Sequence, residues 1–310
     1  MHLDYKGNTV IIAHGLNHQQ LTKIFESGAT DNPLDEILAL AALIQPSFNP
    51  AMLRRLHHDV ARLFRGTYPG VRTCATQYHN LKHTFSVVLA TARLLHGMGQ
   101  NISIYTLELA LYSAYLHDTG LLTETSDKAI SGAVYTQMHE ERSITFMKQY
   151  LASNNLADRL IQECSSVIKC TDLDLEPTEI SFPSPESKLA GYVLGSADIL
   201  AQMADRYYLE NLPFLFQELK EAGVETRESA IDLIQDTTIF YHNIITKRLE
   251  KAFSNTAKLM QIHFHKRWQI NENLYYTNIE KNISYLKKIL KLCEDGLEDL
   301  NTFLKRTPPP

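Results

Sequence analysis

Amphipathic segments with an apolar residue every three to four positions follow one another along almost the whole chain, and this period is typical of α-helices packed on a core. They cover residues 34–45, 51–65, 80–97, 104–118, 140–152, 156–170, 187–204, 208–221, 226–252 and 271–293. No alternating strand pattern of useful length interrupts them. The 310 residues include only 13 glycines and 11 prolines, a share below the average of about 12%, which disfavours many short strands joined by tight turns. The sequence therefore predicts an all-α fold.

The periodicity divides the chain into three parts. Residues 1–46 read as an N-terminal helical extension, residues 47–254 as the main helical domain, and residues 255–310 as a C-terminal helical appendage. The formal net charge is −5, and the basic residues gather after position 240. Since no basic field surrounds the whole molecule, we expect neither nucleic acid nor an anionic membrane surface as a partner.

The four cysteines are Cys74, Cys164, Cys170 and Cys293, and they form no C-x-x-C pair and no disulfide-framework spacing. The N-terminal stretch does not read as a signal peptide, and no window approaches the roughly 18 apolar residues of a membrane span. We therefore expect reduced thiols, a cytoplasmic location and no membrane association.

Three separated segments carry side chains that metals prefer. His79 and His83 are four residues apart, which predicts that they share one face of a helix. His117 and Asp118 end a very apolar helix, and Asp198 lies among small and apolar residues of another helix. Burying such groups costs free energy unless a cation compensates them. Imidazole nitrogens combined with carboxylate oxygens suit Mg²⁺, Mn²⁺, Fe²⁺ or Zn²⁺, so we predict one or two divalent ions per chain.

The order of these residues resembles a known signature. His83, then His117-Asp118, then Asp198, on successive helices, is similar to the signature of the HD-domain metal-dependent phosphohydrolase superfamily. The segment Tyr78-His79-Asn80-x-x-His83 resembles the form found in cyclic-nucleotide phosphodiesterases and in bacterial HD or PDEase proteins. The resemblance covers roughly residues 50–250. It implies an HD-domain-like helical bundle and makes residues 47–254 an HD/PDEase-like catalytic domain.

The resemblance also implies roles for individual residues. The divalent ion would be held by His83, His117, Asp118 and Asp198, with Asp118 able to bridge to a second ion. The ion would activate water for attack on phosphorus, and His79 matches the general acid that protonates the leaving alkoxide. His139 is a candidate ligand of a second ion, and Lys82 is a candidate phosphate contact. The implied activity is hydrolysis of a small phosphoester such as a nucleotide.

Two positions depart from the phosphodiesterases and leave the substrate open. Ser86 stands where they have an aspartate, and Leu121 stands where they have a histidine. The substrate could thus be a cyclic nucleotide or another phosphoester. Two alternatives remain beside the hydrolase, an HD-type di-iron oxygenase and a metal-binding HD protein without turnover. The oxygenase needs more histidine ligands than the core four residues and His139 supply.

The C-terminal helix carries an apolar stripe at coiled-coil spacing. The stripe consists of Ile279, Ile283, Leu286, Leu290, Cys293, Leu297, Leu300 and Leu304. A narrow stripe of this kind needs a partner surface. We favour packing on the chain's own helices, because Gly296 weakens a long free-standing helix. The alternative is a homodimer in which two such helices meet.

Overall fold

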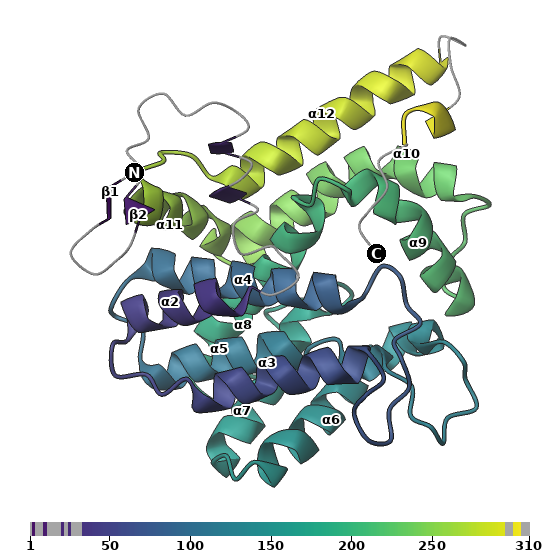
Figure 1. The fold of residues 1–310 in the computed structure, drawn as a ribbon. Helices are drawn as coiled ribbons and strands as arrows, with labels where there is room; N and C mark the ends of the chain where they lie inside the picture. Colours follow the sequence, from purple (N-terminus) through teal and green to yellow (C-terminus); the bar gives the residue numbers. More distant parts are fainter. Residues whose placement is uncertain are drawn as a thin grey trace.

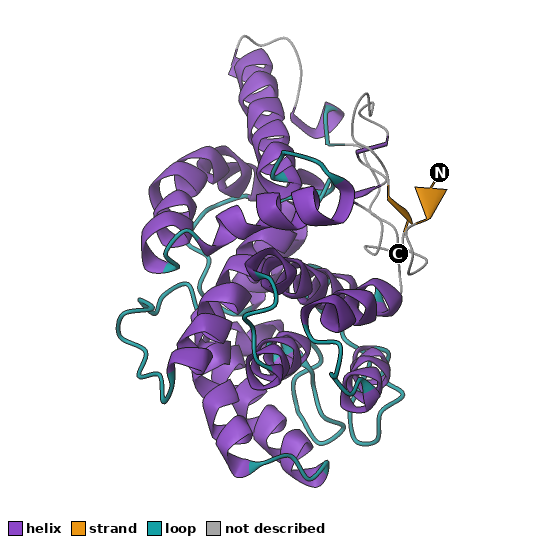
Figure 2. Ribbon diagram, turned by 90° about the vertical axis from the view of Figure 1, so that its left-hand side faces the viewer, coloured by secondary structure: helices purple, strands orange, loops and turns teal. Residues whose placement is uncertain are grey.

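The computed structural model describes residues 2–3, 9–10, 20–21, 24–25, 33–294 and 300–304, and these form an all-α bundle, which confirms the predicted fold class (Figures 1 and 2). The α-helices are α2 (Leu34–Ile44), α3 (Ala51–Phe64), α4 (Leu81–Met98), α5 (Ile104–Leu116), α6 (His139–Ser153), α7 (Asp158–Ile168), α8 (Pro185–Met203), α9 (Tyr208–Glu221), α10 (Ala230–Phe240), α11 (Leu259–Trp268) and α12 (Leu274–Glu294). Short 3₁₀ turns are η1 (Thr119–Leu121), η2 (Gly132–Met138), η3 (Lys169–Thr171), η6 (Thr256–Lys258) and η7 (Leu300–Thr302). Two two-residue strands, β1 (His2–Leu3) and β2 (Thr9–Val10), pair in antiparallel fashion.

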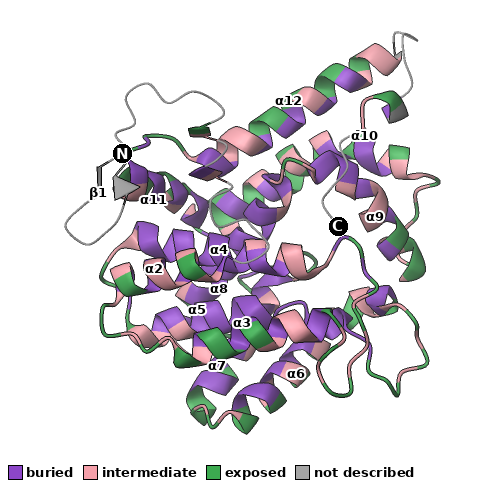
Figure 3. Cartoon of the chain, viewed as in Figure 1, coloured by how far each residue is buried: buried purple, intermediate pink, exposed green. Residues whose placement is uncertain are grey.

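Helices α4, α5 and α8 form the centre of the bundle and pack against one another. Almost every residue of α4 after its first turn is buried, and so is almost all of α5 (Figure 3). A helix that is apolar on all sides is stable in water only when other helices cover all of its sides. Helices α2 and α11 cover α4, α3 and α7 flank α5, and α7 also contacts α8. The candidate site residues lie on the three central helices or directly beside them.

Helix α11 was not among the predicted helices. Its buried side includes His263 beside Phe264 and Trp268, so its sequence does not show a clean apolar stripe. Helix α11 packs on α4 at very short range, because a Cβ on Gly97 would lie 2.2 Å from the carbonyl oxygen of Leu259. The absence of a side chain at Gly97 therefore allows the two backbones to approach.

The predicted helix over residues 226–252 differs from the observed one. Helix α10 begins after a capping box in which the side chains of Ser229 and Asp232 bond to each other's backbone N–H. It then continues into two π-helical segments, η4 (Tyr241–Ile245) and η5 (Arg248–Ala252). The buried Arg248 guanidinium donates to the carbonyl oxygens of Asp172, Leu173 and Leu175. This side chain ties the π-helical segment to the loop before α8, which no local sequence pattern predicts.

The apolar stripe of α12 packs on the chain's own helices over the part that the structure describes. Ile279, Ile283 and Leu286 are buried, and α12 contacts α8, α9, α10 and α11. Leu290, Cys293 and Leu304 are half-buried, Leu300 is buried, and Leu297 lies outside the described residues. Self-packing is therefore the observed arrangement for the first half of the stripe, and homodimerisation stays a prediction.

Helix α12 projects from one end of the bundle (Figure 2) and braces the end of α8. The buried Asn282 amide donates to the carbonyl oxygens of Met203 at 2.9 Å and of Asp205 at 2.8 Å. The described apolar core runs without a break from α2 to α12, so it crosses the predicted boundaries at residues 46 and 254, and the three-part division stays a prediction. Among the described residues, none of the helices combines the length and the apolar character needed to cross a bilayer.

Candidate metal centre

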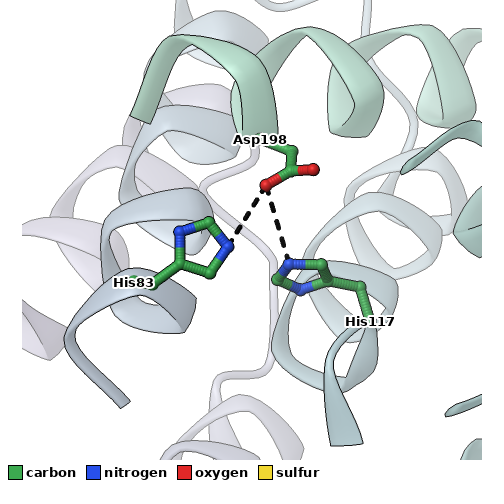
Figure 4. A group of neighbouring side chains, drawn as sticks. All are labelled: His83, His117 and Asp198. Atoms are coloured by element: carbon green, nitrogen blue, oxygen red, sulfur yellow. Dashed lines mark ion pairs between the residues drawn. The ribbon is translucent and has the colours of Figure 1, made fainter. Parts of the chain in front are cut away.

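His83 lies in the first turn of α4, and its position is fixed by the cap of that helix. The Asn80 side chain accepts a hydrogen bond from the His83 backbone N–H at 3.0 Å, and its amide donates to the Gln77 carbonyl at 2.6 Å. A side-chain oxygen at this position satisfies a backbone donor that the helix itself cannot use. The chain therefore turns sharply at Asn80, and α4 starts with the His83 imidazole turned toward α5 and α8 (Figure 4).

His117 and Asp118 link α5 to the 3₁₀ turn η1, with His117 as the C-cap of α5 and Asp118 as the N-cap of η1. The His117 Nδ1 lies 2.9 Å from the carbonyl oxygen of Ala114, which can only accept, so Nδ1 carries the proton of the neutral ring. Its Nε2 is then left with a free lone pair, as in histidines that bind metals through one nitrogen and a protein acceptor through the other. Both His117 and Asp118 are buried.

The two histidines meet the carboxylates of Asp118 and of Asp198 on α8. His83 Nε2 lies 3.2 Å from Asp118 Oδ2 and 3.2 Å from Asp198 Oδ1. His117 Nε2 lies 3.3 Å from Asp118 Oδ2 and 3.9 Å from Asp198 Oδ1. Figure 4 shows His83, His117 and Asp198 pointing toward one another, and one ligand atom from each lies within 4.8 Å of the other two. This cluster can hold a metal ion.

Three of the converging atoms are buried without a hydrogen bond. His83 Nε2, His117 Nε2 and Asp118 Oδ2 have no hydrogen-bond partner among the described residues, although each lies near an opposite group. A buried polar atom left unsatisfied costs about 1–3 kcal/mol. Three such atoms directed at one point fit a site that a cation completes, and two imidazoles with carboxylates form a donor set that divalent ions accept.

The electrostatics of the cluster also favour a positive charge at its centre. Burial alone would lower the pKa of His83, but the contacts and charges of Asp118 and Asp198 outweigh it and raise the pKa to about 10. Burial would raise the pKa of Asp118, but His117 and His83 hold it well below its usual range. Imidazoles are the groups that lie within ion-pair distance of these two carboxylates. An imidazole is neutral when it binds a metal, so it does not balance the charge of the two buried, ionised carboxylates. A bound cation would balance that negative charge.

His79 lies in the turn before α4, and the prediction of one helix face for His79 and His83 was wrong. The Asn80 cap ends the turn, so the helix begins only at Leu81. The two rings are nevertheless 5.6 Å apart between centroids. His79 Nδ1 lies 2.7 Å from Glu218 Oε2. Burial would lower the pKa of His79, but this bond to Glu218 and the charge of Asp118 raise it above its ordinary value.

His139 is the first residue of α6 and reaches the same cluster. Its Nδ1 lies 2.7 Å from the carbonyl oxygen of Thr136, and its Nε2 lies 3.7 Å from Asp118 Oδ1. The next residue, Glu140, has a carboxylate that is 13% exposed. Burial, together with the charges of Asp172 and Asp118, raises the pKa of Glu140 to about 8. The structure thus brings His139 to the site and adds an acidic group that the sequence analysis did not single out.

A close contact between η1 and α6 holds Asp118 and His139 in register. The Gly120 N–H donates to Ser143 Oγ at 2.8 Å, and the Gly120 carbonyl accepts from Arg142 Nε at 2.8 Å. A Cβ at Gly120 would lie 2.0 Å from the carbonyl oxygen of His139. The glycine that follows His117-Asp118-Thr119 is therefore required by the approach of α6.

Lys82 precedes His83 in the first turn of α4, and its side chain contacts an acidic residue. Its Nζ lies 3.1 Å from Asp205 Oδ2 and 5.0 Å from the centre of the Tyr207 ring. A cavity of about 40 Å³ lies between Lys82, His83, Ser86 and the start of α9. Ser86, which stands where the phosphodiesterases have an aspartate, thus lines this cavity at the edge of the buried cluster.

The sequence pattern assigned no role to Glu218 or Gln202, nor to Tyr78, which was named only as part of the segment Tyr78-His79-Asn80-x-x-His83. Glu218 is 139 residues away from His79, and nothing in the sequence connects the two. Gln202 could have been found, because it follows Asp198 by four residues and so lies on the same helix face. Its Nε2 donates to Asp198 Oδ1 at 3.0 Å.

The comparisons with known proteins identify a family. A family model described as Npun_R2479-like matches residues 116–282, which is more than half of the chain. The matched span contains His117, Asp118, His139, Asp198, Gln202 and Glu218, whereas His79, Lys82 and His83 precede it. A search of curated proteins gave no match. The chain belongs to the Npun_R2479-like family.

Proposed function

We propose that the protein is a metal-dependent phosphohydrolase of HD-domain type, with a phosphodiesterase-like site for a nucleotide or another small phosphoester. The ion would be held by His83, His117, Asp118 and Asp198. The observation that carries this proposal is the convergence of three buried, unbonded atoms, His83 Nε2, His117 Nε2 and Asp118 Oδ2, beside Asp198 Oδ1. Such an arrangement is costly in the absence of a cation.

The donor set suits Mn²⁺, Fe²⁺, Zn²⁺ or Mg²⁺, since it joins imidazole nitrogens to carboxylate oxygens and contains no thiolate. When bound, a divalent ion would supply an activated water and neutralise charge on the phosphoryl oxygens. The contribution of the chain is to orient the four ligands. The Ala114 carbonyl fixes the His117 tautomer, the Asn80 cap fixes His83, and burial keeps bulk water from competing.

His79 is the proposed general acid. Glu218 accepts from Nδ1, so Nε2 is the nitrogen left to give a proton to the leaving oxygen. Burial would lower the pKa of His79, but Glu218 and Asp118 raise it above its ordinary value, which favours the protonated ring that an acid needs. Lys82 lies in the first turn of α4 and is the proposed phosphate contact. To bind the phosphate, its ammonium group would leave Asp205.

The proposal includes a second divalent ion, held by Asp118 and His139. His139 Nε2 and Asp118 Oδ1 are 3.7 Å apart, so His139 is close enough to share an ion with the aspartate that also faces His83. Room for a second ion is also the observation that favours the second candidate function, that of a di-iron oxygenase, which needs two ions. Among the described residues, the cluster has only three imidazoles besides the proposed acid, His139 included. Because the oxygenase needs more histidine ligands, hydrolysis is the preferred function.

A phosphoester screen tests the proposal. Purified protein is supplied with Mn²⁺, Mg²⁺ or Fe²⁺ and assayed on bis-nitrophenyl phosphate, nitrophenyl phosphate, cyclic nucleotides and linear nucleotides. We expect metal-dependent release of product that a chelator abolishes and that Asp118→Ala lacks. Oxygen uptake by the iron form without hydrolysis would favour the oxygenase. Tight metal binding with no turnover on any substrate would favour a metal-binding protein without catalysis.

We propose a cytoplasmic location because the cysteines form no disulfide. All four are free, and Cys164 and Cys170 are buried, where burial raises the pKa of each thiol to about 12. Thiols that stay protonated are poor nucleophiles and resist oxidation. This arrangement fits a reducing compartment.

A further inference from the structure

Gln202 contacts the metal cluster although it is no metal ligand in the proposed site. It follows Asp198 by one turn of α8, so the two side chains lie on the same face. Its Nε2 donates to Asp198 Oδ1 at 3.0 Å, and this is the same oxygen that lies 3.2 Å from His83 Nε2. The amide therefore holds the carboxylate by the oxygen that faces the histidines.

Tyr78 fixes which end of the Gln202 amide faces Asp198. The Tyr78 hydroxyl donates to Gln202 Oε1 at 3.1 Å. With the amide oxygen held in this way, the amide nitrogen is directed at the carboxylate. Tyr78 is itself buried, so its ring is fixed by packing.

The same tyrosine is connected to the proposed acid. The Tyr78 backbone N–H donates to Glu218 Oε1 at 2.6 Å, while Glu218 Oε2 lies 2.7 Å from His79 Nδ1. A continuous chain of contacts therefore runs from Asp198 through Gln202, Tyr78 and Glu218 to His79. It joins α8 and α9 to the turn before α4.

We propose that Tyr78 and Gln202 are positioning residues that hold the Asp198 carboxylate in the orientation required for a divalent ion, with Tyr78 acting through Gln202. The inference rests on the proposed metal site and adds to it the residues that orient one of its ligands. A carboxylate with a fixed hydrogen bond has less freedom to lose when an ion binds, and outer partners of this kind typically contribute a factor of about 10–100 in metal affinity.

The test measures Mn²⁺ affinity directly, from the electron paramagnetic resonance signal of free Mn²⁺ during titration of the full-length protein. Gln202→Met keeps the length of the side chain and removes both polar atoms, and Tyr78→Phe removes only the hydroxyl. We expect Gln202→Met to weaken Mn²⁺ binding about 10–100-fold and Tyr78→Phe to weaken it by less. The double variant should bind no more weakly than Gln202→Met alone, because Tyr78 acts through the amide.

Matched controls separate positioning from general damage. Gln45→Met removes another partly buried amide, which lies at the end of α2 and bonds to the Ile102 carbonyl, and Tyr150→Phe removes a hydroxyl bonded to Asp59. Both controls should bind Mn²⁺ like the wild type. Wild-type affinity in Gln202→Met overturns the inference and leaves the proposed metal site standing. Multiplied losses in the double variant overturn the action of Tyr78 through Gln202, and a wild-type protein that binds no Mn²⁺ overturns both the inference and the proposed function.

Discussion

His79→Ala is expected to lower kcat for phosphoester hydrolysis by roughly 10²–10⁴, the usual contribution of a general acid, while metal binding stays intact. The imidazole lies beside the cluster, at 5.6 Å from the His83 ring, and its Nδ1 is held by Glu218. Removing it takes away the proton for the leaving oxygen without removing a proposed ligand. The loss should shrink for leaving groups that need no proton, so steady-state rates on nitrophenyl and alkyl esters are compared.

The dependence on the leaving group is the decisive part of this experiment. His58→Ala serves as the control, because His58 is an exposed histidine of α3 and its removal should leave kcat unchanged. A deficit of the same size for nitrophenyl and alkyl esters would show that His79 is not the acid. Loss of bound metal in His79→Ala would instead make it a ligand.

Gly120→Ala is expected to destabilise the fold and the metal site together. The new Cβ would lie 2.0 Å from the His139 carbonyl oxygen and 2.7 Å from the Ser143 nitrogen, and both are backbone atoms that cannot turn aside. Overpacking of this kind costs about 1–3 kcal/mol, which in a chain of this size should lower the unfolding midpoint by about 2–6 °C. Because Asp118 directly precedes η1 and His139 begins α6, Mn²⁺ affinity should fall about tenfold.

Gly223→Ala is the control for this prediction. Gly223 has a φ of +74°, but apart from its two neighbours in the chain no described residue has a heavy atom within 4 Å of the place that a Cβ would take. Alanine there therefore meets backbone strain of about 1 kcal/mol without a clash, and its Mn²⁺ affinity should match that of the wild type. An unchanged midpoint and affinity in Gly120→Ala would contradict the role given to the contact between η1 and α6.

The fold class could be predicted from the sequence because most helices of this chain pack by an apolar face that follows the helical period. Helix α5, in which nearly every residue is buried, was predicted to within two residues. Helix α11 was missed, because its buried side includes a histidine whose environment is supplied by α4 and by aromatic neighbours. Local periodicity cannot reveal a polar residue that a distant helix accommodates.

In the candidate site, too, the residues marked by a sequence pattern could be predicted, whereas those brought in by the packing of distant helices could not. The order of His83, His117-Asp118 and Asp198 along the chain resembles the HD-domain signature, and this resemblance predicted that they meet. In the structure they do meet, since each lies on a helix of the central layer or at its end. The helical placement of His79 failed because the Asn80 side chain caps α4 and shortens it. Glu218 could not be predicted, because only the folding of α9 over the start of α4 brings it to His79.

The metal content of the protein tests the central claim most directly. Wild type and Asp118→Ala are equilibrated with Mn²⁺, freed of loose ions and measured by elemental analysis, with the exposed Asp174→Ala as a control and circular dichroism as a check of folding. We predict about one to two equivalents per chain in the wild type and in Asp174→Ala, and loss of most of the metal in Asp118→Ala. A wild type without bound metal, or an Asp118→Ala variant with wild-type content, would contradict the account.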